Sequence, residues 1–168
     1  NRMDTLLLLP ALCWVWWPQR GWHSAKSALA GFAPFLCWPI FSLWYYGFPL
    51  PNTAYAKLNT GIPLSESIQR GIWFLSSSFE LDPLTLPAIT LAILLPLAKR
   101  AWRDLPLSLG LMLYLLYILR IGGDFMAGRF LSAPLLISAV LIARHTLRKP
   151  AHLTIAIAAL LLASLATP

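Results

Sequence analysis

The chain has 168 residues, of which 58% are hydrophobic and 11% charged, and its formal net charge is +7. Soluble domains carry about 25% charged residues, so this composition excludes an ordinary soluble protein and indicates an integral membrane protein. The basic residues are dispersed over short loops, which argues against nucleic-acid binding. We expect a single transmembrane domain, 1–168, that is a fragment of a larger polytopic protein, because it begins at Asn1 without a methionine or signal peptide.

Six apolar runs follow one another along the chain, and they predict about six transmembrane helices in an all-α polytopic membrane protein. Several runs are shorter than the roughly 20 residues that span a bilayer straight, so their helices are expected to include flanking residues. Prolines inside the runs predict kinks. The runs are Thr5–Trp17, Ala28–Tyr46, Leu84–Ala98, Leu105–Leu119, Phe125–Ala143 and Leu153–Ala166.

The loops between these runs alternate in charge. Loops 18–27, 99–104 and 144–152 together contain eight basic residues and one acidic residue. Loops 47–83 and 120–130 contain four basic and four acidic residues. Because basic loops stay in the cytoplasm, the first three loops are predicted to be cytoplasmic. The other two loops and both chain ends are then extracytoplasmic.

The cysteines and histidines give no motif for a metal. Cys13 and Cys37 lie inside apolar runs at different depths, which predicts two buried thiols without a disulfide. His23, His145 and His152 lie in the basic loops without evident carboxylate or cysteine partners. We interpret these histidines as membrane-interface residues.

The long loop 47–83 predicts two short helices on the outer face. A glycine and two prolines end the preceding membrane helix, after which Asn52 or Thr53 is expected to cap a helix through Lys57 that stops at Gly61. Pro63 then opens a second helix with one apolar and one polar face, which is typical of a helix lying in the membrane surface. Its apolar residues are Leu64, Ile68, Ile72, Leu75 and Phe79.

Two roles are open for this second helix. It either covers the helix bundle or shapes a lipid-accessible groove. In the second role, Lys57 and Arg70 contact a lipid phosphate, Arg through a fork of donors and Lys as a point charge. In the first role, both are interface residues that extend toward water.

The sequence Gly122-Gly123-Asp124 lies between two apolar runs, with Arg120 before it and Arg129 after it. Charges at a membrane boundary are costly, so their clustering predicts a functional site. Adjacent glycines permit a sharp turn and the close approach of a ligand. Asp124 is also suited to cap the next helix, a role that is compatible with function. We therefore predict a site for an anionic group at this loop.

Two motifs resemble a known family. They are Tyr45-Tyr46-Gly47-Phe48-Pro49-Leu50-Pro51-Asn52-Thr53-Ala54-Tyr55-Ala56-Lys57 and Gly122-Gly123-Asp124-Phe125-Met126-Ala127-Gly128-Arg129. In this order, and on the same predicted side, they resemble the arabinofuranosyltransferases of the GT-C membrane class, which include mycobacterial cell-wall and pilin arabinosyltransferases. The resemblance covers the chain from about Arg2 to Pro134.

The resemblance implies an enzyme of the bacterial cytoplasmic membrane. Such an enzyme transfers arabinofuranose from a polyprenyl-phosphate donor to an extracytoplasmic glycan or glycoprotein. In this class the acidic residue nearest the chemistry belongs to the first outer loop, so the catalytic base is expected upstream of Asn1 and the fragment alone is expected to be inactive. By motif position and inference, Asp124 is the candidate catalytic residue. The candidate substrate-binding residues are Arg120, Arg129, Gly122, Gly123, Tyr45, Tyr46, Asn52, Lys57 and Arg70.

The chemistry is compatible with this site. Transfer from a lipid phosphate needs a base for the acceptor hydroxyl and cations for the departing phosphate. One carboxylate does not decide whether a divalent metal joins Asp124. The alternatives are a transporter or flippase for a lipid-linked sugar, which would carry ionisable residues deep inside its helices, and a structural membrane subunit in which Asp124 is dispensable.

Overall fold

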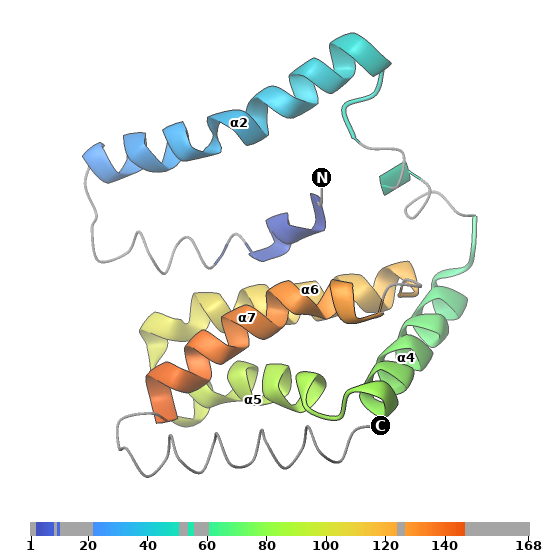
Figure 1. Cartoon of the computed structure of the whole chain (residues 1–168), viewed down its shortest axis with the longest axis vertical. Helices are drawn as coiled ribbons and strands as arrows, with labels where there is room; N and C mark the ends of the chain where they lie inside the picture. The colour runs from blue at the N-terminus through green and yellow to red at the C-terminus, as the bar shows by residue number, and fades with distance from the viewer. Residues whose placement is uncertain are drawn as a thin grey trace.

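A computed structural model describes residues 3–8, 10, 22–50, 54–55, 61–123 and 127–146. These residues form five α-helices and two short 3₁₀ helices, and no strand occurs among them, so the all-α prediction is confirmed for this part of the chain. The elements, shown in Figure 1, are η1 (Met3–Leu8), α2 (Trp22–Tyr46), α4 (Leu64–Leu81), α5 (Thr85–Ala98), η3 (Trp102–Asp104), α6 (Leu105–Ile121) and α7 (Ala127–Thr146).

Glycines end two of these helices where the sequence predicts. α2 stops at Tyr46, and the N–H of Gly47, which has φ of +76°, donates to the Leu43 carbonyl oxygen at 3.1 Å. α6 stops before Gly122, which has φ of +78°. Glycine adopts this left-handed conformation without the steric cost that a Cβ would add.

Two described stretches are long and apolar enough to cross a membrane, Leu29–Tyr46 and Trp102–Ile121. The pair of α4 and α5 adds a third if it forms one broken span, with a bend of 110° between the two helices. The predicted run Thr5–Trp17 lies mostly outside the described residues, and Leu153–Ala166 lies wholly outside them. The prediction of six spans therefore goes beyond what the described helices establish.

Helices α5, α6 and α7 lie side by side, and α4 crosses one end of them (Figure 1). Apolar side chains from all four helices form the core under that end. They are Phe74, Ile89, Tyr114, Ile118, Phe130 and Leu131. A second core cluster fills the other half of the bundle with Ala92, Leu107, Leu111 and Leu141.

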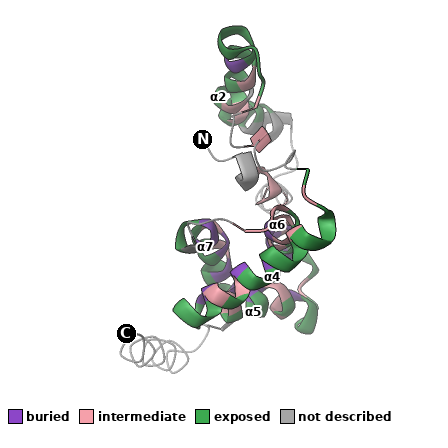
Figure 2. Cartoon of the chain, turned by 90° about the vertical axis from the view of Figure 1, so that its right-hand side faces the viewer, coloured by how far each residue is buried: buried purple, intermediate pink, exposed green. Residues whose placement is uncertain are grey.

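Helix α2 lies apart from this bundle in both views (Figures 1 and 2), and most of its described side chains are exposed. The thiol of Cys37 is exposed on it, so the prediction of a buried thiol is wrong for Cys37; Cys13 lies outside the described residues. Ser42 is buried, and its hydroxyl donates to the Phe48 carbonyl oxygen at 2.8 Å, beyond the end of the helix.

Helix α4 confirms the predicted helix after Pro63, but the face that contacts the bundle is not the apolar one. Its buried residues are Gly71, Phe74 and Ser78. Most of the predicted apolar face is exposed, including Ile72 at 54%. The exposed surface of α4 therefore includes most of these apolar side chains.

Candidate functional site

The Gly122–Gly123 turn is built on the last turn of α6. The Gly123 N–H donates to the Ile118 carbonyl oxygen at 3.1 Å, and both glycines have left-handed φ angles, +78° and +79°. These hydrogen bonds satisfy carbonyl oxygens that have no partner within the helix. The backbone therefore reverses sharply at the end of α6.

Helix α4 packs directly against this turn. A Cβ added to Gly123 would lie 2.5 Å from the Cβ of Phe74, and one added to Gly122 would lie 3.3 Å from the Cβ of Arg70. In α4, one turn before Phe74, a Cβ on Gly71 would lie 2.7 Å from the Cα of Leu119 in α6. A side chain larger than hydrogen does not fit at Gly71, so this glycine lets the backbones of α4 and α6 approach closely, and at Gly123 the Phe74 side chain occupies the space that a Cβ would need.

Exposed arginines occur on the three helices next to the turn in space or in sequence, α4, α6 and α7. Arg70 forms an ion pair with Glu66, with 2.6 Å between Nη2 and Oε1, and its side chain is 57% exposed. Such an exposed pair contributes only about 0.2–1 kcal/mol, so an incoming anion can replace Glu66 at little cost. Arg120 and Arg129 are also exposed, at the end of α6 and in the first turn of α7.

The structure does not bring the tyrosines to this turn. The rings of Tyr45 and Tyr46 contact each other, with centroids 4.7 Å apart, and both side chains remain more than half exposed at the end of α2. Asn52, Lys57 and Asp124 lie outside the described residues. Of the predicted site residues that the structure describes, Arg70 lies against Gly122, and Gly123 packs against α4. Tyr45 and Tyr46 lie on α2.

Asp82 is a functional candidate that the sequence analysis missed. Its carboxylate accepts hydrogen bonds from the Leu84 and Thr85 N–H groups, at 3.0 and 3.3 Å, and from the Thr85 hydroxyl. The Thr85 hydroxyl is the main cause that lowers the pKa of Asp82, and partial burial opposes it. The pattern Asp82-Pro-Leu-Thr85 before an apolar run is a helix-start pattern that sequence reasoning could have used.

Asp104 forms a second unpredicted cluster, at the opposite end of the bundle. It is 2% exposed, and its Oδ2 lies 3.1 Å from Arg144 Nε. His145 Nε2 lies 2.9 Å from the same oxygen without satisfying hydrogen-bond geometry, so this contact is an ion pair when the imidazole is protonated. Lys99 Nζ donates to the His145 carbonyl oxygen at 2.8 Å. The interpretation of His145 as a histidine without a carboxylate partner is therefore wrong.

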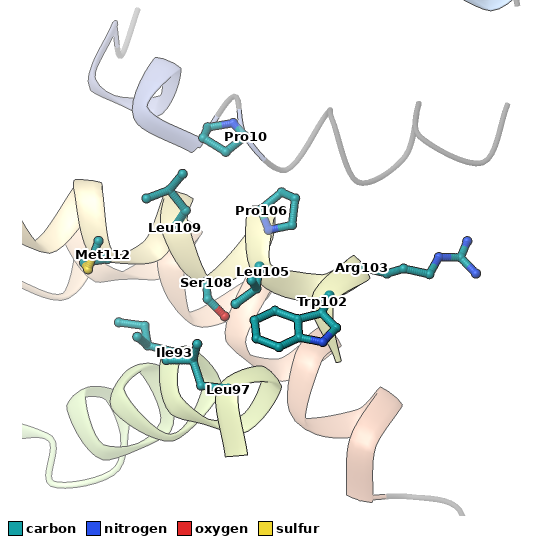
Figure 3. Close-up of a pocket in the computed structure, with 10 residues that line it drawn as sticks. All are labelled: Pro10, Ile93, Leu97, Trp102, Arg103, Leu105, Pro106, Ser108, Leu109 and Met112. Atoms are coloured by element: carbon teal, nitrogen blue, oxygen red, sulfur yellow. The ribbon is translucent and has the colours of Figure 1, made fainter. Parts of the chain in front are cut away.

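A large apolar cavity of about 880 Å³ lies at the same end as Asp104. Figure 3 shows it between α5, η3, the start of α6 and Pro10. Leu97, Leu109 and Met112 contribute to its lining, and the Arg103 side chain extends away from it. A hydrocarbon group suits such walls better than a charged one, so this cavity does not fit a sugar phosphate.

No group of three histidine, cysteine or carboxylate residues gathers among the described residues in a way that would hold a metal ion. Metal binding at Asp124 stays untested, since that residue lies outside the described part. Comparisons of the chain with protein-family models, with curated proteins and with solved structures found no match.

Proposed function

We propose that this chain is part of a membrane glycosyltransferase. It transfers a sugar, arabinofuranose in our proposal, from a polyprenyl-phosphate donor to a glycan or glycoprotein outside the cytoplasmic membrane. The observation that carries the proposal is the fit of the Gly122–Gly123 turn against Arg70 and Phe74. This fit places a half-buried turn beside the exposed Arg70 side chain, within the segment that resembles the family.

The proposal includes a topology of six membrane helices with the Gly122–Gly123 turn on the outer face. The charge difference between alternate loops supports this orientation. The exposed apolar face of α4 adds support, because a helix with lipid on one side and the turn on the other gives a polyprenyl chain access from the membrane. In this topology the Asp104 cluster lies on the cytoplasmic side.

The chemistry assigns separate roles to the charged residues. The acceptor hydroxyl loses its proton to a carboxylate while the bond between the sugar and the donor phosphate breaks. Asp124 is the carboxylate of this chain that we place at the reaction. The phosphate that leaves takes up negative charge, which Arg120, Arg129 or Arg70 stabilises.

A lipid-linked sugar transporter is the alternative, and the core argues against it. A transporter needs a polar path between the two membrane faces. Along the described bundle, the space between the Gly122–Gly123 turn and the Asp104 cluster is occupied by Ile89, Tyr114 and Leu111, all 0% exposed. Buried polar side chains also occur in the bundle, Ser108 and Ser138, but their hydroxyls donate to the main-chain carbonyl oxygens of Ala92 and Pro134.

The test is transfer by the full-length protein in vesicles that contain polyprenyl-phosphate arabinose. Asp124→Asn should reduce transfer at least about tenfold if the carboxylate acts in proton or charge chemistry. Glu80→Gln is the matched control, since Glu80 is an exposed acidic residue of α4 away from the turn. Transfer at the wild-type rate by folded Asp124→Asn would reduce Asp124 to a helix cap and remove the proposed role.

A further inference from the structure

A small cavity of about 210 Å³ lies where the end of α4, the start of α5 and the first turns of α7 meet. Its polar lining consists of Ser78, Asp82, Thr85 and Ser132. Because α7 begins there and α4 crosses there, the cavity lies at the same end of the bundle as the Gly122–Gly123 turn. It differs from the large apolar cavity in its lining and in its position.

The hydroxyl groups of this cavity have already used their hydrogens. Ser78 Oγ and Ser132 Oγ donate to main-chain carbonyl oxygens of their own helices, at 2.8 and 2.9 Å. Thr85 Oγ1 donates to Asp82 Oδ2. Each hydroxyl oxygen keeps lone pairs with which it can accept a further hydrogen bond. These three side chains therefore act as acceptors toward a ligand.

Asp82 strengthens this acceptor character. Its pKa is lowered, mainly by the Thr85 hydroxyl, so the carboxylate is ionised at neutral pH and is a weak proton acceptor for catalysis. An ionised carboxylate accepts hydrogen bonds and donates none. It also disfavours an anionic ligand by charge repulsion.

We propose that this cavity binds a neutral polyhydroxyl group, the sugar ring of a transferase substrate, an assignment that rests on the proposed function. Sugar hydroxyls are donors that match a wall of acceptors. The apolar side chains of Leu81, Leu131 and Leu135, which also line the cavity, suit the C–H face of the ring. The volume corresponds to about seven water molecules at roughly 30 Å³ each, which is room for one monosaccharide and not for a chain.

Gly128 supplies a variant that blocks the cavity without straining the fold. It lines the cavity in the first turn of α7, and a Cβ added to it would meet no atom within 4 Å. Gly128→Leu is therefore expected to fold and to fill the space that the sugar needs. Asp82→Ala is the second variant, and it removes the acceptor that contacts the start of α5.

The experiment measures binding by the full-length protein, using methyl arabinofuranoside as the probe and saturation-transfer NMR with competition as the readout. Affinity for the probe should fall by at least about tenfold in both variants. In Asp82→Ala this is the size of one lost charge-assisted hydrogen bond, and in Gly128→Leu the added side chain competes with the probe for space. Glu80→Gln, two residues from Asp82 and not part of the cavity lining, should bind the probe like the wild type.

Three outcomes separate this site from the proposed function. Wild-type affinity for the sugar in folded Gly128→Leu would overturn the site even if transfer is intact. Binding of methylammonium with no binding of the sugar would also overturn it and indicate a cation site. Sugar binding that Gly128→Leu abolishes, in a protein that transfers no sugar, would keep the site and reject the transferase.

Discussion

Arg129 is exposed in the first turn of α7, where the helix dipole and a guanidinium both attract an anion. We predict that Arg129→Ala weakens binding of the polyprenyl-phosphate donor to the full-length enzyme by about 1–3 kcal/mol, the range for a charge-assisted hydrogen bond. Arg129→Lys should recover only part of this loss, because lysine lacks the forked geometry. The measurement is donor affinity in vesicles.

Acceptor affinity is the control for this prediction, and it should stay constant in both Arg129 variants. Arg120→Ala is the companion variant, since Arg120 is exposed at the end of α6. If neither Arg129→Ala nor Arg120→Ala changes donor affinity, the phosphate site lies elsewhere. Lys57 and Arg70 would then be the next candidates.

Asp104 leads to a prediction about stability. Its side chain is 3% exposed, whereas that of Arg144 is 46% exposed. Removing the cations leaves a buried carboxylate without these two ion pairs, while removing the carboxylate leaves Arg144 able to reach solvent. The double variant Arg144→Gln/His145→Gln should therefore lower the free energy of unfolding by about 3 kcal/mol, and Asp104→Asn should cost about 1–2 kcal/mol.

Thermal unfolding of the purified protein in detergent, at neutral pH, checks this order. Lys99→Gln provides a reference, because Lys99 contacts only the main chain of His145 in this cluster and its side chain is exposed. If Asp104→Asn lowered the free energy of unfolding more than the double variant does, the unpaired buried carboxylate would not be the main source of destabilisation.

Helix α4 is positioned against α6 by a contact that leaves no room for a side chain. Gly71→Ala would place a Cβ 2.7 Å from the Cα and 2.8 Å from the carbonyl oxygen of Leu119. We predict a loss of about 1–2 kcal/mol in unfolding free energy, because an overpacking cost of about 1–3 kcal/mol exceeds the helix-propensity gain of up to about 1 kcal/mol. Donor binding should weaken as well, since Arg70 moves with α4.

The control for this helix contact is Gly31→Ala in α2. It is the same chemical change at a helical glycine where no atom lies within 4 Å of the added Cβ. Stability should be unchanged or raised there. Equal destabilisation by both substitutions would contradict the close approach of α4 and α6.

The ends of the helices are the part of the fold that the sequence predicts well, because local chemistry determines them. Gly47 and Gly122 stop α2 and α6, and Pro63 precedes α4 as expected. Contacts between residues far apart in the sequence are not predicted. The charge pattern identifies an unusual residue, but it does not indicate which residue that one contacts. Asp104 is the sole acidic residue of the basic loops, yet only folding brings Arg144, 40 residues away, to it.

The candidate site shows the same division. The two glycines predict a sharp turn, and the structure confirms it with two left-handed φ angles. The partners of the turn are not encoded locally: nothing in the sequence of α4 indicates that Arg70 and Phe74 lie against the two glycines. The cavity beside Asp82 likewise depends on three helices meeting, so no single segment indicates it.

At the scale of the whole molecule, the proposed topology predicts that α4 and η3 face opposite sides of the membrane. Single cysteines at Ser65 and Arg103, both exposed in the structure, should react with a membrane-impermeant maleimide from opposite sides. The Ser65→Cys variant should label in intact cells and Arg103→Cys only after lysis. Cys13→Ser and Cys37→Ser are the background for both. Labelling of both variants in intact cells would exclude this orientation and the outer-face site with it.

Helix α5 has 14 residues, so it is about 21 Å long at 1.5 Å per residue. The hydrocarbon layer of a bilayer is about 30 Å thick, and Asp82 and Lys99 stand beyond the two ends of α5. In the proposed setting, lipids beside α5 must compress to match so short a helix. The bilayer would then be thinnest next to the bundle. The headgroups of the outer leaflet would lie deeper there, closer to the level at which α7 begins. Membrane thickness, and not side-chain chemistry alone, would then influence how often a donor lipid reaches the enzyme.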